Sequence, residues 1–169
     1  MKTLRVLLTI AAALVLQTTL ARFLVRGAGG IDLVLVAVAY LGLTSGPVAG
    51  ILSGTIAGLA QDSLGSGIVG VGGLAKTVVG FLAGIIGTTF IVSQTIPRFL
   101  VFFGATLVQV AITTGLYFLL DPQPPVMTRY ALLAESLANA LLGVVLFQVL
   151  DAVPGMLDRR RGISRGRVR

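Results

Sequence analysis

Cysteine and histidine are both missing from this 169-residue sequence, and only 11% of its residues are charged. Without these two residue types the chain has no disulfides, no thiolate or imidazole metal ligands, and no cysteine- or histidine-based catalysis. The serines, threonines and carboxylates that remain show no catalytic constellation at a convincing spacing. We therefore expect a protein that is not an enzyme and that has no metal site and no cofactor.

Hydrophobic residues dominate the composition. They make up 56% of the chain, and the mean hydropathy is +1.00, whereas roughly 25% of the residues of an average soluble domain are charged. A chain of 169 residues has room for five or six membrane spans of about 20 residues each. The composition predicts an all-α integral membrane protein with about six transmembrane helices.

Six apolar segments are separated by polar or helix-breaking residues. The first resembles a signal peptide, but its apolar run is long and Thr19-Leu20-Ala21 is a poor cleavage site, so an uncleaved helix is favoured. The second and third segments are only about 20 Å long at 1.5 Å per residue. They are either short spans or a re-entrant pair buried in protein. The segments cover about 4–24, 31–43, 47–61, 68–92, 99–120 and 128–153.

Breaks between the segments are marked by glycine and proline. Gly46-Pro47 argues against one long helix through the second and third segments. The stretch 93–98 is expected to be a turn, and Pro154-Gly155 is expected to end the last helix. The chain thus divides into a membrane domain, 1–154, and a basic tail, 155–169.

Basic residues predict the orientation. Six of the 13 lie in the last eleven positions, which fits a cytoplasmic tail that contacts anionic lipids better than it fits nucleic-acid binding. With six spans and both termini inside, nine basic residues are cytoplasmic and three are outside. The expected location is the bacterial inner membrane, with an arginine anchor for lipid and topology at Arg159, Arg160 and Arg161.

Glycine is concentrated in one stretch. Eleven of the 22 glycines lie between Gly46 and Gly84, and in the third segment a glycine recurs every fourth residue. Residues at that spacing share one helix face, and in a membrane a glycine face lets another helix approach closely. We expect this glycine strip either to pack within the chain or to bind a partner helix. The glycine strip consists of Gly46, Gly50, Gly54 and Gly58.

Several polar side chains lie inside the predicted spans, where charges are costly and indicate function by default. Lys76 and Glu135 lie at depths of about 12 and 10 Å from the outer ends of their spans, and both spans run in the same direction. The two charges can therefore meet, with Asn139 one turn below Glu135. We expect an outer polar cluster, with Gln17 and Arg22 as further candidates. Its members are Asp32, Asp62, Lys76, Glu135 and Asn139.

Most members of this cluster also have a purely structural interpretation. Lys76 can extend along its alkyl stem to the interface. Asp32 is suited to cap the second helix, and Asp62 suits a turn or the cap of the next helix. Glu135 is harder to explain in this way, because a carboxylate at that depth needs a partner or a proton.

One order of residues points to a known family. An aspartate opens a short apolar segment, Gly-Pro breaks the chain, glycines recur, and a second aspartate and more glycines follow. The residues are Asp32, Tyr40, Gly46-Pro47-Val48-Ala49-Gly50, Gly54, Gly58-Leu59, Asp62, Gly67, Gly70, Leu74 and Gly80. This stretch, about 31–84, resembles the rod shape-determining protein MreD family. Lys76, Glu135 and the arginine tail are not part of the resemblance.

The resemblance implies a non-enzymatic inner-membrane scaffold of the elongasome. It implies partnership with an MreC-like bitopic protein, the MreB filament, a RodA-type glycosyltransferase and a class B penicillin-binding transpeptidase in lateral peptidoglycan synthesis. It also implies a fold similar to the S components of energy-coupling-factor transporters. We expect the scaffold to work by helix–helix docking, so that Gly54→Leu or Gly58→Leu disrupts the complex. The alternative is an S-component-like solute-binding or transport protein whose outward-facing polar pocket is the outer polar cluster.

Overall fold

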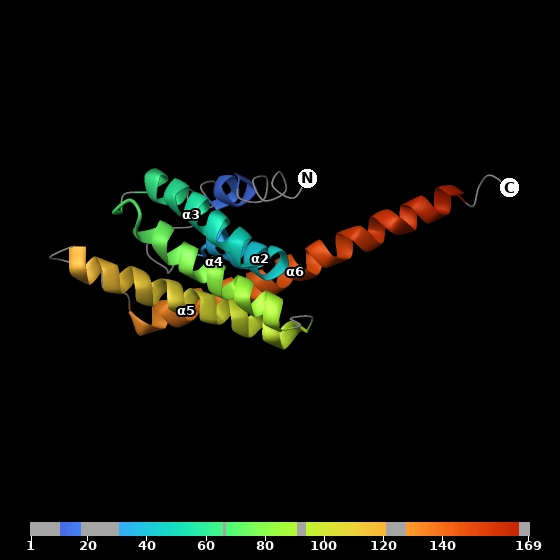
Figure 1. Cartoon of the computed structure of the whole chain (residues 1–169). Coiled ribbons are helices and arrows are strands. Elements are labelled where there is room, and N and C mark those ends of the chain that lie inside the picture. The colour runs from blue at the N-terminus through green and yellow to red at the C-terminus, as the bar shows by residue number, and fades with distance from the viewer. Residues whose placement is uncertain (1–10, 18–30, 66, 91–93, 121–127, 166–169) are drawn as a thin grey trace.

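The computed structural model describes residues 11–17, 31–65, 67–90, 94–120 and 128–165. Figure 1 shows their helices packed together in one bundle, with the last part of the chain's final helix extending beyond it. Regular structure in these residues is helical throughout, which confirms the predicted all-helical class there. A short helical segment, 11–17, is followed by α2 (Leu33–Ser45), α3 (Pro47–Leu64), α4 (Val71–Thr89), α5 (Thr95–Leu120) and α6 (Arg129–Arg165).

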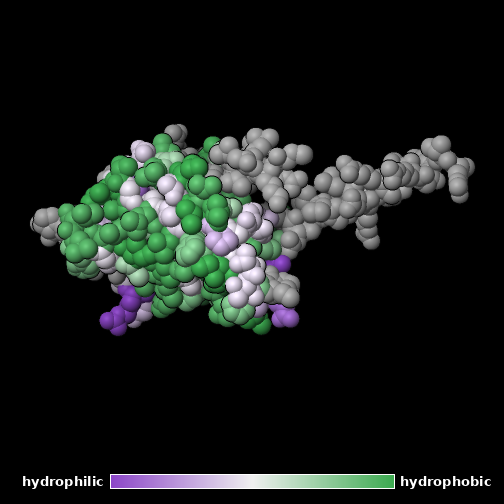
Figure 2. Space-filling view, viewed as in Figure 1, coloured by the Kyte–Doolittle hydropathy of each residue, from purple (hydrophilic) through white to green (hydrophobic). Residues whose placement is uncertain are grey.

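Three stretches of helix in the described residues are long and apolar enough to cross a membrane. They are Val71–Thr89, Thr95–Leu120 and Arg129–Val149, while α2 is apolar but shorter. Figure 2 shows a face that is mostly hydrophobic, with the most hydrophilic residues near its lower edge. A hydrophobic face of this kind suits contact with lipid. The number of six spans stays a prediction, because most of the first predicted segment lies outside the described residues.

Helix α2 lies at the centre of the bundle, where it contacts α3, α4, α5 and α6. Its residues are apolar on all sides, and nine of its 13 residues are buried. A helix that is hydrophobic all round is stable only when other elements cover it. Leu35, Ala39 and Leu43 on α2 pack with Val79 of α4 and Phe102 of α5 in the main core cluster.

The break between α2 and α3 depends on one glycine. Gly46 has a φ of +91°, a conformation that glycine adopts readily and other residues rarely do. Pro47 follows as the first residue of α3, where its missing N–H leaves no helical hydrogen bond unmade. The prediction of two separate helices is confirmed. Both helices end further along the chain than expected, by two residues for α2 and by three for α3.

Two predicted boundaries are wrong. Helix α5 already begins at Thr95, so that Pro97 lies in its first turn, where a proline is tolerated. Helix α6 continues through Pro154 to Arg165. A proline inside a helix removes one hydrogen bond and crowds the carbonyl of the preceding turn, which disfavours the helix without forbidding it. Arginine, by contrast, favours helix. The helix thus carries Arg159–Arg161 beyond the bundle (Figure 1).

Aromatic residues join α6 to α2 and α5. The ring of Phe147 is 5.1 Å from that of Tyr40 in an edge-to-face arrangement, and the Arg98 guanidinium lies 3.8 Å from the centre of the same ring. Phe102 packs directly on Gly143, where an added methyl group would overlap the ring. These contacts, each between parts of the chain far apart in sequence, fix the position of α6 against α2 and α5.

Candidate functional site

A buried ion pair lies at the N-terminal end of α2. The Nζ atom of Lys76 is 2.8 Å from Oδ2 of Asp32, and the two side chains are 4% and 8% exposed. Lys76 belongs to α4, five residues after its first residue. A buried charge is tolerated when it is paired and hydrogen-bonded. The sequence interpretation in which Lys76 extends to the interface therefore does not describe this lysine.

Asp32 has three further contacts. Its Oδ1 accepts a hydrogen bond from the Leu35 N–H at 2.9 Å, which makes it the N-cap of α2. Its Oδ2 accepts a second hydrogen bond from Nε2 of Gln109 at 2.9 Å. Its own N–H donates to Oδ1 of Asn139 at 2.9 Å. One aspartate thus joins α2 to α4, α5 and α6, and it is both the helix cap and a member of the cluster.

Asn139 extends the contacts between α5 and α6. Its Nδ2 donates to Oγ1 of Thr106 at 3.3 Å, and the Thr106 hydroxyl donates to the Phe102 carbonyl at 3.1 Å. Thr106 and Asn139 are both fully buried. Because polar groups in such surroundings are costly unless they are paired, this contact favours one alignment of the two helices.

The helical segment 11–17 also reaches the start of α2. Oε1 of Gln17 accepts a hydrogen bond from the Val34 N–H at 3.0 Å. The first N–H groups of a helix have no partner within that helix, and here Gln17 and Asp32 supply acceptors for two of them. Gln17, a further candidate for the cluster, thus contacts the first turn of α2, which Asp32 caps. Arg22, the other candidate, lies outside the described residues.

Glu135 is next to this network but does not join it by a hydrogen bond. Glu135 is only 7% exposed, and it lies on α6 one turn before Asn139. The carboxyl is within electrostatic reach of Asp32 and Lys76. Among the described residues no hydrogen bond or ion pair of Glu135 is found.

Asp62 lies in a different set of contacts. Its Oδ2 accepts hydrogen bonds from the N–H groups of Gly70 at 2.9 Å and Gly73 at 3.0 Å. These groups belong to the turn before α4 and to its first residues. Asp62 therefore links the end of α3 to the start of α4, in agreement with the interpretation of this residue as a cap. Of the five residues proposed for the cluster, the structure brings Asp32, Lys76 and Asn139 into contact, with Glu135 beside them.

The glycine strip of α3 lies against α4. A methyl group added at Gly50 would overlap the backbone of Gly80, one at Gly54 the backbone of Lys76, and one at Gly58 that of Gly73. Between the same helices, the hydroxyls of Thr55 and Thr77 are 2.8 Å apart. Of the two uses expected for the strip, packing within the chain is the one that accounts for these three positions. Gly46, at the end of the strip, forms the break before α3.

Two members of the network, Gln109 and Thr106, were not singled out from the sequence. Gln109 is an uncharged polar residue in the middle of an otherwise apolar span, a position where polar side chains are rare and need a partner. That signal was present in the sequence. Thr106 carried no comparable signal, because a threonine in a helix can always donate to a carbonyl of the preceding turn, as Thr106 does here.

The chemistry of this site is that of a structural polar network. It contains one ion pair, amides and hydroxyls, and the described residues contain no group of three carboxylates placed to hold a metal ion. Its contacts supply hydrogen-bond acceptors to the first N–H groups of the central helix α2, which lies inside an apolar bundle. The network therefore holds α2, α4, α5 and α6 in one arrangement.

Comparisons with known proteins place the chain in a family. No curated protein and no solved structure matches it, so the expected similarity to S components stays a prediction. The family model that matches is that of the rod shape-determining protein MreD, over residues 1–153. This match covers nearly the whole chain and extends well beyond the stretch 31–84 on which the resemblance was based. The chain therefore belongs to the rod shape-determining protein MreD family.

Proposed function

We propose that this protein is a non-enzymatic scaffold of the bacterial inner membrane that supports cell shape and lateral peptidoglycan synthesis by docking the helices of partner proteins. Membership of the MreD family supports a rod shape-determining role and association with cell-shape machinery of the MreB and MreC type. The partners proposed here are an MreC-like bitopic protein, a RodA-type glycosyltransferase, a class B penicillin-binding transpeptidase and the MreB filament. Anionic lipids are proposed to bind the arginine-rich end of α6.

A difference between two sets of glycines carries the docking proposal. Every glycine within α2, α3 and α4 has a neighbouring atom that an added methyl group would meet. On α5, by contrast, a methyl group added at Gly104 or Gly115 would meet no described atom within 4 Å. Because glycine weakens a helix and small residues in membrane helices allow close approach, an unpacked glycine that also lines a groove favours a partner at that place. Gly104 meets both conditions, whereas Gly115 does not line the groove between α4 and α5.

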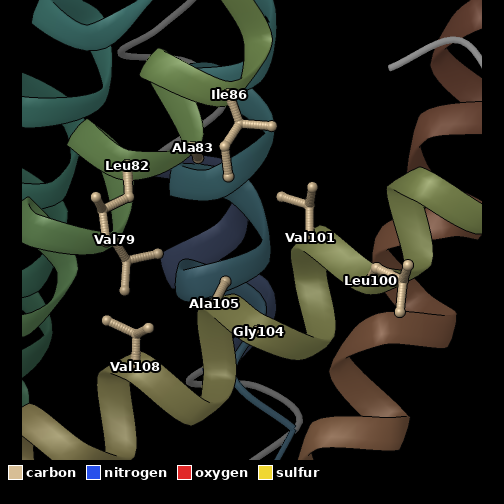
Figure 3. Close-up of a pocket in the computed structure, with 9 residues that line it drawn as sticks. All are labelled: Val79, Leu82, Ala83, Ile86, Leu100, Val101, Gly104, Ala105 and Val108. Carbon is tan, nitrogen blue, oxygen red and sulfur yellow. The ribbon is translucent and has the colours of Figure 1, made fainter. Parts of the chain in front are cut away.

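Gly104 also lines an apolar groove between α4 and α5. The groove has a volume of about 290 Å³, and in Figure 3 Val79 and Val108 face one another across it. Ala83 and Ala105 keep its lining small. We propose that a single transmembrane helix of the MreC-like partner lies along this groove, with its backbone against Gly104. The glycine strip of α3, already packed on α4, is not used for this purpose.

The experiment compares two substitutions on the same helix. Gly104→Leu places a large side chain in the groove, whereas Gly115→Leu places the same side chain on α5 outside the residues that line it. With an MreC-like partner co-expressed, we expect Gly104→Leu to lose co-purification of the partner and to fail to restore rod shape in cells lacking the protein. Gly115→Leu should keep both properties.

The proposal is contradicted if Gly104→Leu inserts in the membrane at a normal level and still co-purifies with the partner. Equal losses for both variants would also contradict it, because the loss would then not depend on the groove. Insertion is measured in the same preparations by the amount of protein in the membrane fraction.

A further inference from the structure

Glu135 is the one buried acid whose charge is not compensated in the described structure. It is the only glutamate in the sequence, and it is 7% exposed. Asp32 has Lys76 as counter-ion at 2.8 Å, so the lysine charge is already balanced. An ionised Glu135 would add a second negative charge in apolar surroundings, which is unfavourable without a partner.

An unpaired acceptor lies on the helix opposite. Gln109 uses its Nε2 in the hydrogen bond to Asp32, but its Oε1 is buried and has no hydrogen-bond partner among the described residues. A buried acceptor left unpaired costs about 1–3 kcal/mol. Gln109 therefore needs a donor, while Glu135 needs either a positive charge or a proton.

Helix register places these two groups at a similar level of the bundle. The contact of Asn139 with Thr106 aligns α6 with α5, and the two helices run in opposite directions in Figure 1. Gln109 is three residues after Thr106, and Glu135 is four residues before Asn139, which corresponds to shifts of about 4.5 and 6 Å towards the same end of the bundle. Both side chains thus lie roughly one turn beyond the Asn139–Thr106 contact.

The surroundings favour a proton over a metal ion. A metal ion at Glu135 would lie near the ammonium group of Lys76, which repels cations. It would also have few anionic ligands, since the described residues hold no cluster of three such groups. A proton needs no further ligand, and it converts the carboxyl into the donor that Gln109 lacks.

We propose that Glu135 is a proton-binding site and that its neutral carboxyl donates a hydrogen bond to Oε1 of Gln109. One proton then satisfies both unpaired groups and leaves the Asp32–Lys76 pair undisturbed. When the proton leaves for water, the carboxylate competes with Asp32 for Lys76 and weakens the contact between α2 and α4. Asp32 and Lys76 are the charged groups within reach of Glu135 in the described residues.

Because the chain has one glutamate, the site can be observed directly in the unmodified protein. Glutamate labelled with carbon-13 at the side-chain carboxyl gives one resonance, whose shift distinguishes the neutral from the ionised form. In protein reconstituted in lipid nanodiscs at roughly pH 6, where a glutamate in water is ionised, we expect the shift of the neutral acid. The shift of a carboxylate at that pH would overturn the proposal.

Stability gives a second, independent readout. A carboxyl that is neutral in the folded state and ionised in the unfolded state stabilises the fold at low pH, and this contribution is lost as the pH rises. Glu135→Gln imitates the neutral acid, so its melting temperature should lose the decrease that the unmodified protein shows between acidic and alkaline pH. Asp62→Asn, on the separate carboxylate that accepts from the turn before α4, should retain that decrease. An unchanged decrease in Glu135→Gln would contradict the proposal.

Discussion

Lys76 and Asp32 form an ion pair of 2.8 Å inside the bundle, and the same aspartate is the N-cap at which α2 begins. Lys76 is about 7.5 Å along α4 from its first residue, and Asn139, the other partner of Asp32, is about 15 Å along α6. The first turn of α2 therefore lies well below the ends of its neighbours. Its N–H groups receive acceptors from Asp32 and Gln17 in place of water.

The ion pair predicts that a second substitution, which removes the other charge, partly restores the stability lost in the first. Asp32→Asn keeps a good N-cap but removes the counter-ion of Lys76, and breaking a buried pair in this way costs about 3–5 kcal/mol. Combining it with Lys76→Met removes both charges, so the double variant should be more stable than Asp32→Asn alone. Unfolding free energies measured in detergent for the single and double variants give the coupling. Strictly additive effects would contradict the proposed pairing.

The packing of α3 on α4 predicts opposite results for two glycines. Gly50→Ala forces the added methyl group into the backbone of Gly80, so α3 and α4 must separate. We expect the free energy of unfolding to fall by about 2 kcal/mol or more, since overpacking typically costs roughly 1–3 kcal/mol and occasionally more. Gly104→Ala meets open space and should leave the free energy of unfolding unchanged or slightly raised. Melting curves of the two variants measure these effects. Similar losses of stability in both variants would show that the glycine strip is not tightly packed.

Asp62 predicts a milder and more local effect. Asp62→Ala removes the acceptor for the N–H groups of Gly70 and Gly73, and loss of such a cap costs about 0.5–2 kcal/mol. Asp62→Asn, which keeps an acceptor oxygen, should recover most of that loss. Amide hydrogen exchange should show faster exchange at the start of α4 in Asp62→Ala only. Faster exchange throughout the bundle would indicate that Asp62 has a more central role than its contacts suggest.

The fold was largely predictable wherever residue chemistry restricts the backbone. Gly46-Pro47 predicted the break between α2 and α3, and the uniformly apolar segment 31–43 corresponds to the buried centre. Depth in the membrane predicted a meeting of Lys76 with Glu135. In the structure Lys76 pairs with Asp32, which also contacts Asn139, and Glu135 lies beside them. The family resemblance, drawn from the stretch 31–84, is confirmed over residues 1–153.

Other features depended on how each helix is rotated about its axis and on which helix it contacts, and a single sequence does not specify either. Depth alone grouped Asp62 with the cluster, but its side chain lies among the N–H groups of the turn before α4. The four-residue spacing of glycines indicated a packing face without indicating whether another part of the chain covers it. Pro154 was given too much weight as a helix end, since an internal proline disfavours a helix by about 3 kcal/mol without forbidding it.

Topology predicts a labelling pattern in this cysteine-free chain. If both termini are cytoplasmic, single cysteines at positions 95 and 165 should be protected from an impermeant thiol reagent added outside, and cysteines at positions 65 and 123 should react. Position 28 should react from outside in either form of the second and third segments. Position 45 distinguishes the two forms, because it should react from outside only if that pair re-enters. Reaction of position 165 from outside would contradict the proposed orientation.

The most direct test is a cross-link between α3 and α4. The hydroxyl oxygens of Thr55 and Thr77 are 2.8 Å apart, and no other cysteine is present to interfere, so Thr55→Cys combined with Thr77→Cys places two thiols within reach of a disulfide. After mild oxidation in native membranes, we expect a disulfide within one chain, with Thr55→Cys/Gly104→Cys as the unlinked control. Linkage only between two chains, or none, would contradict the claim that the glycine strip of α3 is packed against α4 of the same molecule.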